Sequence, residues 1–342
     1  MAKFKKRVIK RLYTPSFPSW PRRVWREDGN VVLQADTTAF RVDAGVLIHQ
    51  SPIFADLLSE TVLKSQQTYQ SCPIVVLSDS SYDLEHFLKA VFDPRYVTTD
   101  DDSDLEVAVL TAILHLSTKY VIPHLRRQAI RSLRTNYFPS SLALWDALNL
   151  PNPPRRHTIT EVVNIANCAS ETRVPVILVP ALTICSALGI DQIIDGVENA
   201  SPDDTDQAQL TPHLQRLLLQ ARPQLQHLAL SKTLGWLYGH GHPCAQKCAA
   251  AKSRAARSLL DGTRPKQSVW FPLSIFDVSE IVDEDMCQLC VDDFNTSILP
   301  RRQEAWDQLP SIFGYESWEA LTRMADSDEL GSDISKPNPS RI

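Results

Sequence analysis

Glycine is scarce in this chain, with 10 glycines among 342 residues, or about 3% against a usual value of about 7%. Phosphate-cradling loops need glycines where the backbone approaches the ligand, and the sequence contains neither G-x-G-x-x-G nor a Walker loop. The metalloprotease pattern H-E-x-x-H and the nucleophile pattern G-x-S-x-G are missing as well. Together these absences disfavour nucleotide binding and common hydrolytic mechanisms, and we expect the chain not to be an enzyme.

Long apolar runs are also scarce, and one uncharged stretch, residues 174–190, is comparable in length to a membrane span. Its length sits at the lower edge of the range of about 17–25 residues for a spanning helix. Pro175 and Pro180 interrupt the run. We therefore predict a buried core helix that begins near Pro180, and no association with a membrane.

The net charge of −5 is unevenly distributed. Residues 1–26 carry nine Lys and Arg and no acid, so the rest of the chain carries −14. This pattern predicts a basic, disordered arm over residues 1–26, with a nuclear-import or anion-binding segment as the alternative. The arm lacks the apolar core of a secretory signal, and seven cysteines without such a signal indicate a reducing compartment. We expect an intracellular protein of the nucleus or cytoplasm.

The first third of the chain alternates strand and helix patterns. A β-branched run over residues 31–35 and an apolar–polar alternation over 40–43 predict a hairpin. Two short helices separated at Ser51-Pro52 follow, with Ser51 as the cap of the second and Pro52 at its first position. A strand at 74–77 and helical stripes at 82–91, 109–116 and 125–133 complete the pattern.

This order of elements, together with several segments, resembles the BTB/POZ domain, especially that of fungal proteins. In the family His commonly follows the Phe-x-Val strand, whereas Asp43 stands here. The resemblance covers residues 28–135 and implies an α+β fold, a small sheet with surrounding helices over residues 27–136. A mostly α-helical C-terminal region is expected over 155–322. The matching segments are Val31-Val32-Leu33, Phe40-Arg41-Val42, Val46-Leu47, Ser51-Pro52-Ile53-Phe54, Leu116-Ser117-Thr118-Lys119-Tyr120 and His124-Leu125-Arg126.

BTB/POZ domains are interaction modules, so the resemblance implies a scaffold or regulatory protein without a catalytic site. Many such domains form homodimers through apolar helix surface, and covering that surface gains roughly 25 cal/mol per Å². The partners implied are a second copy of the chain and other proteins. Candidate contact residues are Val31, Leu33, Leu47, Phe54 and Leu57. The alternative is that all five belong to the core of the domain.

The second half of the chain begins after the proline-rich segment 150–154, which predicts a domain boundary. Helical stripes follow around residues 159–166 and 214–221. Near the end, Trp306, Phe313 and Trp318 predict a hydrophobic clasp onto the helical core, with an aromatic binding face as the alternative. Residues 323–342 are acidic with few apolar side chains, so we expect a disordered tail.

Four of the seven cysteines form two close pairs, C-x3-C at Cys244 and Cys248 and C-x2-C at Cys287 and Cys290. Zinc takes four thiolate or imidazole ligands in a tetrahedron, and two such pairs are a usual way to supply them. The intervening 38 residues exceed the usual spacing of about 15–20. The pairs therefore leave three alternatives open: a zinc site, small buried side chains, or redox chemistry.

Three functions follow from these observations. The favoured one is a homodimerising interaction protein of the BTB/POZ type. The second is a substrate adaptor for a cullin-type ubiquitin ligase, which adds a cullin as a partner. The third is a nucleic-acid-linked transcriptional regulator that uses the basic arm and a zinc-stabilised C-terminal region. We do not favour nucleic acid as a partner.

Overall fold

A computed structural model describes most of the chain, in eight segments. The chain divides into two compact units, residues 1–96 with 120–122, and residues 97–119 with 123–342. This division differs from the predicted domain boundaries, because the helices α5 (Val107–Lys119) and α6 (Pro123–Asn136) pack with later helices of the second unit. Residues 1–23 of the predicted basic arm lie outside the described part. The segments are 24–59, 67–97, 105–148, 157–198, 207–233, 235–238, 246–260 and 286–327.

The first unit contains a four-stranded sheet in the order β2-β1-β4-β3. β1 (Val31–Ala35) pairs antiparallel with β2 (Thr38–Val42) and parallel with β4 (Cys72–Leu77). The short β3 (Thr68–Tyr69) pairs with the start of β4. The predicted hairpin and third strand are thus confirmed. β3 was not predicted, since its two residues are too few to show a period.

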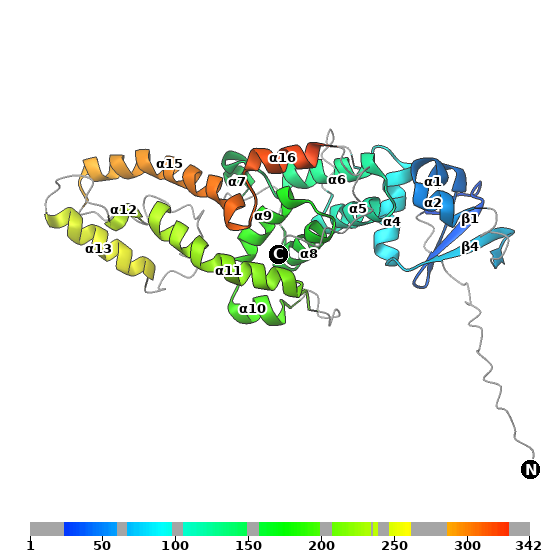
Figure 1. The fold of residues 1–342 in the computed structure, drawn as a ribbon, viewed down its shortest axis with the longest axis horizontal. Helices are drawn as coiled ribbons and strands as arrows, with labels where there is room; N and C mark the ends of the chain where they lie inside the picture. The colour runs from blue at the N-terminus through cyan, green and yellow to red at the C-terminus, as the bar shows by residue number, and fades with distance from the viewer. Residues whose placement is uncertain are drawn as a thin grey trace, which may run out of the picture. The chain divides into compact units, whose positions relative to one another are not determined.

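Three helices accompany this sheet, α1 (Ala44–Gln50), α2 (Pro52–Leu57) and α4 (Ser81–Phe92) (Figure 1). Asp43 caps α1, because its carboxylate accepts a hydrogen bond of 2.6 Å from the Gly45 amide. The Ser51 hydroxyl accepts one of 3.0 Å from the Phe54 amide, and Pro52 occupies the first turn of α2. The predicted cap at Ser51 is confirmed. Asp43, the residue at which the sequence departs from the BTB/POZ pattern, is the N-cap of α1.

The predicted contact residues of this unit lie mainly in its core. The side chains of Val31, Leu33, Leu47 and Phe54 have no exposed surface, and Leu57 is half-buried. Phe54 stacks on Tyr120 with their ring centroids 4.3 Å apart. Because a side chain without exposed surface cannot touch a partner in this conformation, the first four are core residues here, which was the alternative interpretation.

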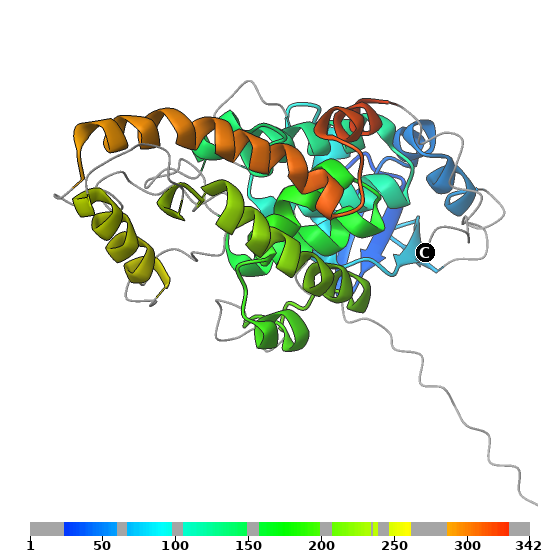
Figure 2. The same ribbon diagram turned by 60° about the vertical axis from the view of Figure 1, so that its left-hand side comes forward.

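The regular elements described in the second unit are helices, together with one isolated β-bridge between Val197 and Ala208. α5 packs against α6 and α8, and α8 packs against α9. Further along, α11 and the π-helical turn η2 run alongside the long helix α15, as Figures 1 and 2 show from two directions. The helices are α5 (Val107–Lys119), α6 (Pro123–Asn136), α7 (Leu142–Leu148), α8 (Ile159–Glu171), α9 (Pro175–Cys185), α10 (Ile190–Asp195), α11 (Pro212–Leu228), η2 (Ala229–Thr233), α12 (Gly235–Tyr238), α13 (Gln246–Leu260), α15 (Gln288–Ile312) and α16 (Trp318–Asp326).

α9 is the buried helix that the uncharged stretch predicts, but its start was predicted wrongly. It begins at Pro175, and Pro180 lies inside it. A proline in the first turn removes an amide that has no helical partner anyway, and neighbouring helices bury α9 on nearly every side. Within the described residues, no helix has both the length and the apolar character needed to cross a bilayer.

The aromatic residues near the end form a clasp on the helical core, as predicted. Trp306 is 1% exposed and stacks on Trp318 with ring centroids 4.7 Å apart. Its other neighbour is Trp145 of α7, at 5.4 Å. α16 continues to Asp326, so the first residues of the predicted acidic tail are helical. The mixed α+β character of the chain, a small sheet followed by a mostly helical region, is thus confirmed.

Candidate metal centre

Three of the four paired cysteines lie at the N-terminal ends of two helices. Cys248 is the third residue of α13, Cys287 is the N-cap of α15, and Cys290 is the third residue of α15. The first turn of a helix presents unpaired amide groups and the positive end of the helix dipole. The thiolate is the form of cysteine that binds metals.

The three sulfur atoms form a compact group. The Sγ atoms of Cys248, Cys287 and Cys290 all lie within 4.8 Å of one another. Four thiolates around one zinc ion, at a Zn–S distance of about 2.3 Å, lie about 3.8 Å apart along each edge of the tetrahedron. Small side-chain movements would therefore bring these three sulfurs to metal-binding distance. The group can hold a metal ion.

A backbone hydrogen bond ties the two helix ends together at this group. The Cys287 amide donates to the Cys248 sulfur over 3.3 Å, across 39 residues of sequence. The structure thus brings Cys248 of the first predicted pair together with both cysteines of the second, despite the unusual spacing.

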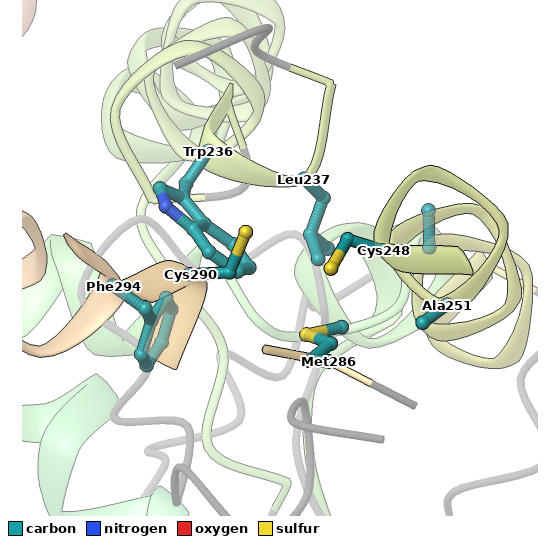
Figure 3. Close-up of a cluster of buried hydrophobic side chains, with 8 residues drawn as sticks. Trp236, Leu237, Cys248, Ala251, Met286, Cys290 and Phe294 are labelled. Carbon is teal, nitrogen blue, oxygen red and sulfur yellow. The ribbon is translucent and has the colours of Figure 1, made fainter. Parts of the chain in front are cut away.

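Two of the three cysteines in this group are buried and the third is exposed. Cys248 is 3% exposed and Cys290 1%, whereas Cys287 is exposed. Figure 3 shows Cys248 and Cys290 lying among the apolar side chains of this part of the molecule. The buried cluster consists of Trp236, Leu237, Cys248, Ala251, Ala256, Met286, Cys290 and Phe294.

One buried cation lies in the same region. The Lys252 side chain is 8% exposed, and its ammonium lies 3.9 Å from the centroid of the Trp236 ring. The edge of that ring faces α15, because its Nε1–H donates a hydrogen bond of 2.7 Å to the Asp293 carboxylate. Lys252 was not singled out in the sequence, although its position four residues after Cys248 places both on one face of a helix.

The remaining predicted ligand, Cys244, lies outside the described residues. Cys72, Cys168 and Cys185 are buried elsewhere, in β4, α8 and α9. Burial raises the pKa of the Cys185 thiol to about 12, so this cysteine behaves as a small apolar side chain. Sequence reasoning therefore located the thiol group but not the cation and aromatic residues that surround it.

No protein-family model matches the chain. Comparisons with curated proteins and with solved structures also give no match.

Proposed function

We propose that this chain is a protein-interaction scaffold rather than an enzyme, and that a structural zinc ion stabilises its C-terminal helical region. The observation that carries the zinc proposal is the group of three sulfurs within 4.8 Å. Structural zinc sites are closed by four protein ligands, whereas catalytic sites keep one position open for water or substrate. The burial of Cys248 and Cys290 supports the structural kind, with Cys244 as the fourth ligand.

Zinc would join α13 to α15 at their N-terminal ends. A hydrogen bond from the Cys287 amide to the Cys248 sulfur already links these two ends. Four bonds to a metal ion would add a strong constraint, because structural zinc sites contribute directly to folding free energy. The ion would then hold this part of the helical region in one conformation.

The experiment for zinc is metal analysis of the purified full chain under reducing, metal-replete conditions. We expect one equivalent of zinc per chain, lost in Cys248→Ala, Cys290→Ala and Cys244→Ala. Cys72→Ala is the matched control, because Cys72 is a buried cysteine of the first unit and its removal leaves the zinc content unchanged. Less than a tenth of an equivalent in the unsubstituted chain would refute the zinc proposal.

The interaction part of the proposal concerns residues 28–135, which include most of the first unit and which we propose to be a homodimerising module of the BTB/POZ type. It is supported by the resemblance over residues 28–135 and by the order of strands and helices in this unit. Two large apolar side chains on adjacent helices are exposed as well, Ile48 on α1 at 40% and Ile53 on α2 at 37%. These two residues are better contact candidates than their buried neighbours, because a partner can reach them.

Size-exclusion chromatography with light scattering tests this part. We expect a mass twice that of one chain, and a single-chain mass for the double variant Ile48→Asp, Ile53→Asp. Thr37→Asp introduces the same charge at an exposed position in the β1–β2 turn and should leave the dimer intact. A single-chain mass for the unsubstituted protein at high concentration would refute dimerisation.

The cullin-adaptor and nucleic-acid functions stay predictions, and the basic residues 1–23 lie outside the described part.

A further inference from the structure

Lys252 is a buried cation whose charge needs compensation. Its side chain is 8% exposed, and burying an unpaired ammonium is costly. Among the described residues, its ammonium forms no ion pair within 4.0 Å, and its close contact is the face of Trp236 at 3.9 Å. An aromatic face attracts a cation, but this attraction is weaker than that of a full negative charge. The surroundings of Lys252 therefore point to an anion nearby.

The thiol group is the candidate source of such an anion. Lys252 follows Cys248 by four residues on α13, and side chains at this spacing are neighbours on the helix surface. Trp236, which carries the ammonium on its face, belongs to the same buried cluster as Cys248 and Cys290. The indole is held in turn by Asp293 of α15, through its Nε1–H. Lys252 thus shares a helix face with Cys248, and its ammonium lies against a ring of the cluster that contains Cys248 and Cys290.

Metal binding would create the anion. A zinc ion carries two positive charges, so three thiolates leave a net charge of −1 and four leave −2. In a buried site this charge is weakly screened by solvent and interacts strongly with a fixed neighbouring cation. A lysine close to this centre would offset one unit of it.

We propose that Lys252 is the counter-charge of the zinc–thiolate centre, a positioning residue that favours the metal-loaded, fully thiolate form without binding the metal itself. This inference rests on the proposed zinc site. It assigns a role to a residue outside the ligand set, and it predicts that the charge of Lys252, more than its volume, governs metal affinity.

The test compares zinc affinities of full-length chains by competition with a chromophoric chelator. Residues that support metal ligands typically contribute about 10- to 100-fold to affinity, and we expect Lys252→Met to lose an amount in this range. Lys252→Arg keeps the charge and should recover most of the loss. Lys247→Met is the matched control on α13, because Lys247 is exposed and solvent screens its charge.

A second measurement separates a charge effect from damage to the fold. With zinc removed, Lys252→Met should be no less stable to heat than the unsubstituted chain, because methionine fills the same space without a buried charge. With zinc bound, it should be less stable. Cobalt substitution should give the same thiolate-to-metal absorption bands in both chains, which shows an unchanged ligand set.

The outcomes distinguish the two proposals. If the unsubstituted chain binds no zinc, the proposed centre is refuted, and Lys252 loses its role with it. If zinc binds but Lys252→Met binds it equally tightly, the centre stands and the counter-charge inference is wrong. An equal loss of stability with and without zinc, or failure of Lys252→Arg to recover affinity, would also overturn the inference, because either result indicates packing instead of charge.

Discussion

Arg302 and Asp146 form a bidentate ion pair that joins α15 to α7 across 156 residues of sequence, with N–O distances of 2.8 and 2.6 Å. The Arg302 side chain is 3% exposed. Replacing Asp146 by alanine would leave a buried positive charge without its carboxylate, which typically costs about 3–5 kcal/mol. We expect a loss of this size in the free energy of unfolding of Asp146→Ala, measured by urea denaturation.

The exposed pair between Arg134 and Asp326 is the control for this prediction. Asp326 is 66% exposed in that pair, and exposed ion pairs contribute about 0–1 kcal/mol. Asp326→Ala should therefore change stability little. The double variant Arg302→Met, Asp146→Leu should recover most of the loss, because it removes both charges together. Equal effects of Asp146→Ala and Asp326→Ala would contradict the assigned importance of the buried pair.

Ser51 makes two hydrogen bonds with one hydroxyl. It accepts from the Phe54 amide as the cap of α2 and donates to the Tyr120 carbonyl at 2.5 Å. Loss of a cap and of a buried hydrogen bond together costs about 2 kcal/mol, and we expect this loss in Ser51→Ala by thermal or urea unfolding. Ser80 caps α4 from an exposed position. Ser80→Ala should cost about half as much, and an equal cost in the two variants would be evidence against the Tyr120 bond.

His157 predicts a pH dependence of stability. Its ring lies 5.6 Å from that of Phe138, and burial lowers the pKa of the imidazole below its ordinary value of 6.5, although Glu161 opposes the shift. As the pH falls below about 6.5, the unfolded chain binds a proton before the folded chain does, so stability decreases until the lower, folded-state pKa is passed. His157→Phe keeps the ring contact and removes this contribution.

Urea midpoints at about pH 7.5 and about pH 5.5 provide the measurement. The decrease between the two pH values should be smaller in His157→Phe than in the unsubstituted chain. His124, whose pKa is lowered by burial and by Arg127, contributes equally to both chains. An identical decrease in the two chains would show that His157 binds its proton equally well in both states.

The cysteines should differ strongly in their reactivity toward iodoacetamide. Burial raises the pKa of the Cys185 thiol to about 12, so at pH 8 this residue is almost entirely protonated and unreactive. Cys287 is exposed at a helix N-terminus. In the folded, zinc-free chain, mass spectrometry should find Cys287 alkylated first and Cys185 alkylated only after unfolding. Added zinc should slow the reaction of Cys287, and similar rates for Cys185 and Cys287 would contradict this assignment.

Local patterns predicted the first unit well because they act over a few residues. The β-branched run of β1, the turn before β2 and the Ser51-Pro52 junction each depend on near neighbours in the chain. The predicted start of α9 near Pro180 was wrong for a related reason. A proline in the middle of a helix is disfavoured in isolation, and only the surrounding helices of the second unit make it tolerable.

The cysteine group could be predicted only in part from the sequence. The spacing of the cysteine pairs indicated a group of ligands, yet the long insert between them argued against it. α13 and α15 overcome that distance by meeting at their N-terminal ends. Likewise, Leu47 and Ile48 are adjacent apolar residues, but the Leu47 side chain is buried whereas the Ile48 side chain is 40% exposed. Chain spacing and residue type cannot supply such information.

Four properties follow from the amino-acid sequence alone. They are the scarcity of glycine-based motifs, the periods of the main strands and helices, the cap at Ser51 and the close spacing of the late cysteines. These properties follow from short-range sterics and hydrogen bonding, which are encoded within one or two turns of chain. Three other properties depend on the tertiary structure. They are the grouping of three cysteines, the burial of Lys252 beside Trp236, and the exposure of particular apolar side chains. Those depend on packing between segments far apart in sequence, where burial sets both the cost of a charge and the surface left for a partner.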